Sequence, residues 1–422
     1  MSTSVAISAI APSPERRARR SVISTAAARD AILAAMPAFA SEPIPVPASV
    51  GRVLRQSVLA ERDQPPFDRV MMDGIAISFR DFEKGVRRFP LQATQAAGDR
   101  KLALEAGKAI EIMTGASLPE NADCIVPVER INVSDGAAEV EPDYKAKERQ
   151  FIHPHGSDHV KGAELLASGK RISPMDIAII NSCGLTDIEV SKSPSIRVIS
   201  TGNELVAAGE PIEAHQIRMS NGPAVIAMLG NHGFDNCAHD HLIDDRELLE
   251  EKISAHLNNA DVLILSGGVS MGKADYIPQV LADLGVEVIF HKISQRPGKP
   301  MWFGIGPKQQ AVFALPGNPV STLVCCRQYV IPALNAASGL TEKQPEFAAL
   351  TQNVSFKPKL TCFLPVRLLS NTGGQVLAMP VHTNTSGDFA SLSGTDGFLE
   401  LPLEESDFPA GTAAQLHRWA QQ

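Results

Sequence analysis

The sequence predicts a multidomain chain in which one α/β domain is joined to smaller β domains. Between residues 195 and 340, continuous apolar segments alternate with amphipathic ones, which is typical of a parallel sheet covered by helices on both faces. Short alternating segments separated by turn residues fill residues 58–160 and 341–422, which is typical of β structure. The length of 422 residues leaves room for roughly two to four domains of ordinary size.

Composition and charge exclude several classes of protein. Apolar residues make up 44% and charged residues 20% of the chain, which is ordinary for a globular protein. The formal net charge of -8 argues against nucleic-acid binding, because phosphate neutralisation needs a basic surface. No apolar segment reaches the roughly 18 residues that cross a membrane. None of the six cysteines forms a Cys-x-x-Cys pair, so we expect reduced thiols and a cytoplasmic protein.

The order of the predicted segments suggests that one domain is inserted into another. We divide the chain into a disordered tail (1–20), a helical linker domain (21–57 and 161–194), an inserted β domain (58–160), an α/β domain (195–340) and a C-terminal β domain (341–422). The tail is rich in Ser, Pro, Ala and Arg without a period, although a docking arm is an alternative. Ser24 and Ser173 are each expected to cap a helix of the linker. A turn at Ser134-Asp135-Gly136 predicts a hairpin in the β domain.

The α/β domain is expected to contain five strands with helices between them. We place the strands at residues 196–200, 237–243, 262–265, 286–290 and 311–315, and the starts of four helices at Asn221, Asp244, Tyr276 and Pro319. In such folds ligands lie outside the carboxyl ends of the strands. After residue 341, strands at 361–369, 376–381 and 398–403 predict a small barrel or sandwich.

The strongest binding signal is a glycine-rich loop after the strand at 262–265. It runs Ser266-Gly267-Gly268-Val269-Ser270-Met271-Gly272. The glycines let backbone N–H groups turn toward an anion, and the dipole of the following helix adds to the attraction. We therefore expect a phosphate site, with a tight turn that binds nothing as the structural alternative.

The same loop contains the pattern of a serine-hydrolase nucleophile. Gly268-Val269-Ser270-Met271-Gly272 matches G-x-S-x-G and follows a strand. A catalytic triad would need a later histidine, and the later histidines we consider are His291, His382 and His417. The Lys-Ala-Asp that follows does not resemble an elbow leading straight into a helix, so the hydrolase stays the minor alternative.

Two further loops favour a phosphate ligand. Pro316-Gly317-Asn318-Pro319 follows the strand at 311–315 and offers another helix start. Arg296-Pro297-Gly298-Lys299-Pro300 holds two cations on stiff backbone, and Lys299 is the better candidate for phosphate contact. Each loop has a plain alternative as a rigid or solvated turn.

Three carboxylates are predicted at the strand ends where the phosphate would lie: Glu204, Asp244 and Asp275. They would repel a phosphate unless a divalent cation bridges them, and Mg²⁺ usually bridges phosphate oxygens through one or two carboxylates. We therefore infer a magnesium ion, with a structural N-cap as the alternative for Asp244. Zinc needs three converging ligands, so we treat the histidines at 153, 155, 159, 239 and 241 as ordinary loop and strand residues.

At this point the motifs resemble one family, the molybdopterin molybdenumtransferases (MoeA in bacteria, the E domain of gephyrin in animals). The resemblance begins near Ser21 and rests on the motifs Ser266-Gly-Gly-Val-Ser-Met-Gly-Lys-Ala-Asp-Tyr276, Arg296-Pro-Gly-Lys-Pro300, Leu315-Pro-Gly-Asn-Pro-Val-Ser321, Met72-Asp-Gly74, Ile112-Met-Thr-Gly-Ala116, Gly156-Ser-Asp158 and Thr201-Gly-Asn-Glu-Leu205. It implies a Mg²⁺-dependent reaction that inserts molybdate into adenylylated molybdopterin and releases AMP. The α/β domain would then be the molybdopterin-binding domain.

The resemblance also implies roles for individual residues. Family roles match Asp73, Thr114, Asp158, Glu204, Asp244, Asp275, Pro316 and Pro319. Asp244 and Asp275 would hold the metal, and Glu204 and Asp158 would orient molybdate or water. Family members are homodimers with the active site between subunits, so Asp73 and Thr114 would face the partner's α/β domain. An upstream adenylyltransferase and downstream molybdoenzymes are the implied partners.

The sequence departs from the family pattern at five positions. Ile75, His153, Ser157, Asn203 and Met219 stand where the family usually has Tyr, Arg, Glu, Asp and Asp. These positions surround the carboxylate site and leave the phosphate loops intact. A divergent paralogue or a scaffold that binds molybdopterin without turnover is therefore a second alternative.

Overall fold

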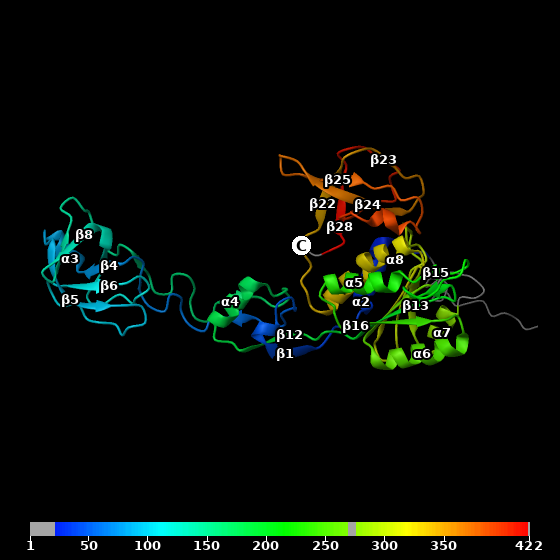
Figure 1. The fold of residues 1–422 in the computed structure, drawn as a ribbon, viewed down its shortest axis with the longest axis horizontal. Helices are drawn as coiled ribbons and strands as arrows, with labels where there is room; N and C mark the ends of the chain where they lie inside the picture. The colour runs from blue at the N-terminus through cyan, green and yellow to red at the C-terminus, as the bar shows by residue number, and fades with distance from the viewer. Residues whose placement is uncertain (1–21, 269–275, 421–422) are drawn as a thin grey trace, which may run out of the picture.

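The computed structural model describes residues 22–268 and 276–420. Figure 1 shows an elongated molecule with a β domain at one end, a narrow linker in the middle and the α/β domain beside a C-terminal β domain at the other end. Within the described residues, no helix is long and apolar enough to cross a membrane.

The sheet of the α/β domain has six strands in the order β16-β13-β17-β21-β20-β18. These are β13 (Ile196–Thr201), β16 (Cys237–Leu242), β17 (Val262–Ser266), β18 (Glu287–His291), β20 (Trp302–Ile305) and β21 (Ala311–Leu315). The five expected strands run in the same direction, and β20 lies antiparallel between β21 and β18. β20 is not among the strands that we predict from the sequence. A tight turn follows this strand, in which the Gly306 N–H donates to the Gln310 carbonyl, and it returns the chain directly to the neighbouring β21. A two-stranded sheet of β14 (Leu205–Val206) and β15 (Ile217–Arg218) adjoins this domain.

Helices cover both faces of this sheet. They are α5 (Asn221–Asn231), α6 (Arg246–Asn259), α7 (Ile277–Asp283), α8 (Pro319–Cys325) and α9 (Ile331–Ala337), with a π-helical segment at Cys326–Val330 between the last two. One face packs into a core with Val198 and Ile264, and the opposite face into a core with Ile199 and Leu265. This alternation follows from the period of two along each strand.

The first helix, α2 (Thr25–Ala35), begins at the predicted cap, where the Ser24 side chain accepts a hydrogen bond from the Ala27 N–H. From the sequence we assign residues 21–57, which include this helix, to the linker, but the helix packs on the α/β domain. Ala28 and Ile32 are buried in the core of the α/β domain, where α2 contacts β18 and α9. The sequence shows the apolar face of a helix but not the surface that covers it.

The linker is less helical than expected. Its one longer helix, α4 (Pro174–Ser182), starts in a capping box between Ser173 and Asp176, as the sequence indicates. Around it lie two small antiparallel sheets: β1 (Ser41–Pro45) with β12 (Asp187–Ser191), and β2 (Val58–Leu59) with β11 (Glu164–Leu166). A 3₁₀ turn spans Val46–Ala48. The linker is therefore a mixed unit that two chain segments build together.

The inserted β domain is built on a six-stranded sheet in the order β7-β4-β6-β5-β9-β8. Its elements are β3 (Arg69–Val70), β4 (Gly74–Ile77), α3 (Phe79–Glu83), β5 (Arg88–Gln95), β6 (Ala109–Ile112), β7 (Cys124–Pro127), a 3₁₀ turn (Val128–Arg130), β8 (Ile131–Ser134), β9 (Ala137–Val140) and β10 (Ile152–His153). The predicted hairpin joins β8 to β9. Asp135 and Gly136 both have positive φ, as a tight hairpin turn requires.

The C-terminal domain is a closed barrel in which β24, β25, β22, β28 and β26 pair in turn and β26 returns to β24. Its elements are β22 (Glu346–Leu350), β23 (Val354–Ser355), β24 (Thr361–Ser370), β25 (Val376–Pro380), a 3₁₀ turn (Phe389–Leu392), β26 (Gly397–Leu401), β27 (Asp407–Phe408) and β28 (Ala413–Arg418). A short strand from the α/β domain, β19 (Gln295–Arg296), pairs with β24. Closure removes the exposed strand edges that a sandwich would keep.

The half-buried carboxylate of Glu400 links the barrel to the helices beside it. Glu400 accepts hydrogen bonds from Thr25 (3.1 Å) and Gln328 (3.3 Å), and it pairs with His417 at 3.1 Å. Burial raises the pKa of Glu400, but the hydrogen bond and charge of His417, with the charge of Arg29, hold that pKa below its ordinary value of 4.5. A carboxyl whose pKa is lowered in the folded protein stabilises it above the ordinary value and loses that effect as the pH falls.

We therefore expect Glu400→Gln to lower the free energy of unfolding by about 2 kcal/mol at neutral pH. The difference in the free energy of unfolding between the two proteins should narrow as the pH falls below 4.5, because Glu400 is protonated in the unfolded chain before it is protonated in the folded protein. Urea denaturation at a series of pH values measures this. Glu346→Gln, at an exposed carboxylate paired with Arg418, is the control and should change little. A gap that does not depend on pH would contradict this role for Glu400.

Candidate functional site

Three loops meet at the carboxyl ends of β13, β17 and β21. The Asn221 side-chain amide, at the start of α5, joins two of them: Nδ2 donates to Ser266 Oγ (2.9 Å) and to the Gly317 carbonyl (2.7 Å). We expected Asn221 to cap its helix, but Ser220 holds the cap position without a side-chain bond. The sequence offered only a polar residue at a helix start, so this link between the loops was missed.

The two described glycines of the glycine-rich loop adopt conformations that other residues rarely take. Gly267 has φ +102° and Gly268 has φ +63°. A Cβ on Gly267 would lie 2.7 Å from the Thr201 carbonyl oxygen, and one on Gly268 would lie 2.7 Å from Ile277 Cγ1. Only glycine therefore lets this loop pack against the end of β13. The remaining predicted loop residues, Ser270 and Gly272, lie outside the described residues, as does Asp275.

The start of α8 lies beside this loop. Pro319 occupies the first helical position, as predicted, but the Asn318 side chain does not cap the helix. Its amide donates instead to Ser386 Oγ of the C-terminal domain at 2.7 Å. A Cβ on Gly317 would lie 3.6 Å from Gly267 Cα, so the Pro316–Pro319 loop and the glycine-rich loop are in direct contact.

The loop at 296–300 is anchored to α8 on one side, and its two cationic side chains are exposed to solvent. Gly298 is buried against Cys325 of α8, whose Sγ would lie 2.5 Å from a Cβ at that position. The fully buried Gln295 donates to the Pro297 carbonyl at 3.0 Å. Lys299 and Arg296 are exposed. The arrangement holds both cations at the surface beside α8.

Carboxylates lie at the same edge of the sheet. Glu204 folds back over Gly202, since its Oε2 would lie 2.5 Å from a Cβ there. The Asp244 backbone N–H donates to Asn203 Oδ1 at 3.0 Å, which brings the loops after β13 and β16 together. The helix cap that we assigned to Asp244 belongs to Asp245, whose side chain accepts from Leu248 N–H.

These donors fit a magnesium ion only in part. Carboxylate and amide oxygens are the ligands that Mg²⁺ prefers, and Glu204, Asn203 and Asp244 supply them. Among residues 22–268 and 276–420, no group of three His, Cys, Asp or Glu side chains converges. A metal here would therefore depend on oxygens of a bound phosphate as well as on protein carboxylates.

A second group of predicted site residues lies in the inserted β domain. Asp73 Oδ1 accepts two hydrogen bonds from Thr114, one from its N–H (2.6 Å) and one from its hydroxyl (2.7 Å). These bonds lower the pKa of Asp73 and keep its carboxylate charged. Asp158 is held by His153 Nε2 at 2.9 Å, and His153 Nδ1 contacts Arg69 at 3.1 Å.

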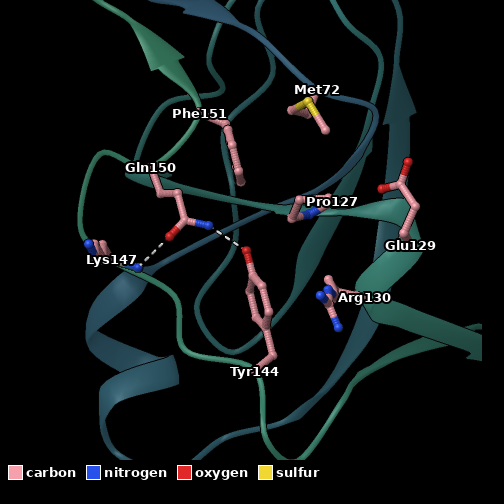
Figure 2. Close-up of a pocket in the computed structure, with 8 residues that line it drawn as sticks. All are labelled: Met72, Pro127, Glu129, Arg130, Tyr144, Lys147, Gln150 and Phe151. Carbon is pink, nitrogen blue, oxygen red and sulfur yellow. Dashed lines mark hydrogen bonds between the residues drawn. The ribbon is translucent and has the colours of Figure 1, made fainter.

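A hollow of about 530 Å³ opens beside Asp73, at Met72 (Figure 2). Its lining comprises Met72, Pro127, Glu129, Arg130, Tyr144, Lys147, Gln150 and Phe151. Figure 2 shows Gln150 bridging one side, where its Nε2 donates to the Tyr144 hydroxyl and its Oε1 accepts from Lys147 N–H at 2.9 Å. Aromatic rings and cations together suit a planar anionic group, although no predicted site residue lines this hollow.

The structure does not bring the two groups together within one chain. Figure 1 shows β4, which Asp73 directly precedes, and β6, which leads to Thr114, at the opposite end of the long axis from β13 and β16. The glycine-rich and Pro316–Pro319 loops therefore cannot act with the Asp73–Thr114 pair on one ligand within a single chain of this shape.

The histidines considered for a hydrolase are engaged elsewhere or remote from the loop in sequence. His417 is buried in the barrel and paired with Glu400, and His291 also has a polar contact. The candidate nucleophile, Ser270, lies outside the described residues.

Comparisons with family models cover most of the chain. The model for the MoeA N-terminal region (domain I and II) matches residues 23–184, and the one for the MoeA C-terminal region (domain IV) matches residues 348–419. Between them, a model described as a probable molybdopterin binding domain matches residues 197–336. All three regions follow the order of the domains described above.

Individual relatives agree with these models. A molybdopterin molybdenumtransferase from Synechocystis sp. is 39% identical over 400 residues, which span 94% of this chain and 100% of that protein. One from Synechococcus elongatus is 33% identical and spans 94% and 99%. A crystal structure of a molybdopterin biosynthesis MoeA protein from Pyrococcus horikosii superposes with a TM-score of 0.81 at 29% identity, over 95% of this chain and 100% of that one.

Proposed function

The chain belongs to the family of molybdopterin molybdenumtransferases, which act in molybdenum cofactor biosynthesis, and we propose that it inserts molybdate into adenylylated molybdopterin with release of AMP. The observation that carries this proposal is the meeting of the glycine-rich loop with the Pro316–Pro319 loop through Asn221. In this proposal, backbone N–H groups of the two loops would bind phosphate oxygens without the need for a mobile side chain.

In this proposal the phosphates of the substrate bind to the two loops. Ser266, Gly267 and Gly268 supply one side, Gly317, Asn318 and Pro319 supply the other, and Lys299 adds positive charge. The glycine conformations and the close contact of the loops support this assignment. We place Ser270 and Gly272 in the same site on the sequence motif alone.

In the same proposal, the carboxylates bind the metal ion and orient the molybdate. Asp244 and Asp275 would hold Mg²⁺, which would neutralise charge on the phosphoanhydride. Glu204, which folds over Gly202 at this edge, would orient molybdate or water. The Asn203 contact that holds the Asp244 backbone supports the position of the first carboxylate.

The remaining site residues would come from a second copy of the chain. Asp73, Thr114 and Asp158 would face the α/β domain of the partner in a homodimer. Their distance from the phosphate loops within one chain supports this arrangement (Figure 1), because a two-fold dimer can return the far end of one subunit to the near end of the other.

The deciding assay supplies adenylylated molybdopterin, molybdate and Mg²⁺ and measures AMP. We expect AMP release that needs both molybdate and the metal, and chelation of the metal should reduce turnover by at least about 100-fold. Adding Mg²⁺ back should restore it. AMP release no faster than in a protein-free control would refute the proposed reaction.

A further inference from the structure

Thr201 carries a buried hydroxyl for which the described part of the protein offers no partner. It is the last residue of β13, and the residue is 4% exposed. Its Oγ1 makes no hydrogen bond with any described residue. The neighbouring hydroxyl on the same strand differs, since Ser200 Oγ bonds His239 Nε2 at 2.9 Å.

Such a group is costly in a free protein. A buried hydroxyl without a partner loses its hydrogen bonds to water and forms none in the protein to replace them. Unsatisfied buried groups are few in native structures, and each calls for a ligand, an ion or a water. The Thr201 hydroxyl is therefore expected to find its hydrogen-bond partner in a bound ligand, an ion or a water.

The Thr201 hydroxyl lies beside the glycine-rich loop. A Cβ on Gly267 would lie 2.9 Å from Thr201 Oγ1, and one on Gly268 would lie 3.1 Å from the same atom. The hydroxyl thus lies against the two glycines whose conformations open the loop. Ser266, the residue before them, pairs with Ser200 across β17 and β13, so the strand register fixes Thr201 beside the loop.

We propose that the Thr201 hydroxyl is a ligand-binding group that donates a hydrogen bond to a phosphate oxygen held by Gly267 and Gly268. The inference rests on the proposed function, because it takes the phosphate of that site as the acceptor. A hydroxyl bonded to a charged oxygen is worth more than one bonded to a neutral group. Within residues 22–268 and 276–420 no hydrogen bond of this hydroxyl has to break when the phosphate binds, which favours binding.

The test uses the full-length protein and AMP as the probe. Thr201→Val keeps the shape of the side chain and removes only the hydroxyl. We expect its affinity for AMP, measured by calorimetry, to fall about 10- to 100-fold. The free variant should have a melting temperature equal to or above that of the wild type, because the unsatisfied group has gone. A merely structural hydroxyl would instead lower the melting temperature.

Two matched variants complete the design. Thr201→Ser keeps the hydroxyl and should bind AMP within about threefold of the wild type. Ser200→Ala removes the neighbouring hydroxyl, which already bonds His239, and should leave AMP affinity unchanged. If Thr201→Val binds AMP as the wild type does, the inference is wrong while the proposed function stands. If the wild type neither binds AMP nor releases it in the assay above, the proposed function itself fails.

Discussion

Co-expression of an Asp73→Asn variant with a Gly267→Ala variant should yield protein with about a quarter of wild-type turnover, although each variant alone is inactive. Asp73 and Gly267 lie in domains at opposite ends of one chain (Figure 1). If an active site combines the β domain of one subunit with the α/β domain of the other, a mixed dimer contains one intact site and one doubly altered site. Random pairing makes about half of the dimers mixed, which gives the quarter.

Different affinity tags on the two chains allow the mixed dimer to be purified and its AMP release measured. The purified mixed dimer should reach about half of wild-type turnover, since one of its two sites is intact. Co-expression of two differently tagged Asp73→Asn chains is the control and should stay inactive. A mixed dimer as inactive as its parents would contradict a site shared between subunits, and so would a wild-type chain that is monomeric in solution.

Replacement of Gly267 by alanine should abolish phosphate binding and lower stability together. The added Cβ would lie 2.7 Å from the Thr201 carbonyl oxygen, and the backbone φ of +102° is strained for any side chain. The loop must therefore move away from β13, and its backbone N–H groups would no longer be oriented toward the phosphate. We expect kcat/KM to fall at least about 100-fold, because misplacement by an ångström has that effect on a positioned group.

The same change should lower the free energy of unfolding by about 3 kcal/mol, measured with urea. Gly209→Ala separates strain from the clash, because Gly209 has φ +91° but a Cβ added there would meet nothing within 4 Å. This control should lose only about 1–2 kcal/mol and keep its turnover. Normal kcat/KM in Gly267→Ala would mean that the loop does not hold the phosphate.

Much of the fold was predictable because its signals are local. The helix caps at Ser24 and Ser173, the hairpin turn at Asp135-Gly136 and the buried strand before Ser266 each depend on a few neighbouring residues. Backbone conformation and side-chain period decide them. The glycine-rich loop belongs to the same class, since the freedom of glycine is a property of the residue itself.

Other features depend on residues that are distant in the sequence. The antiparallel strand β20, the packing of α2 on the α/β core and the link from Asn221 to Ser266 and Gly317 all join such segments. A polar residue at a helix start can cap the helix or reach across to a loop, and the sequence signal is the same for both. Only the packed structure decides between them.

The sequence by itself determined the family, the order of the main segments and the residues that we expect to bind phosphate. It could do so because motifs and periodic patterns depend on residues that are close together in the sequence. The tertiary structure decided which of those residues meet. It placed the glycine-rich and Pro316–Pro319 loops together at one edge of a sheet and the Asp73–Thr114 pair at the far end of the molecule. It also left the Thr201 hydroxyl without a described partner beside Gly267, because a contact depends on distance in space.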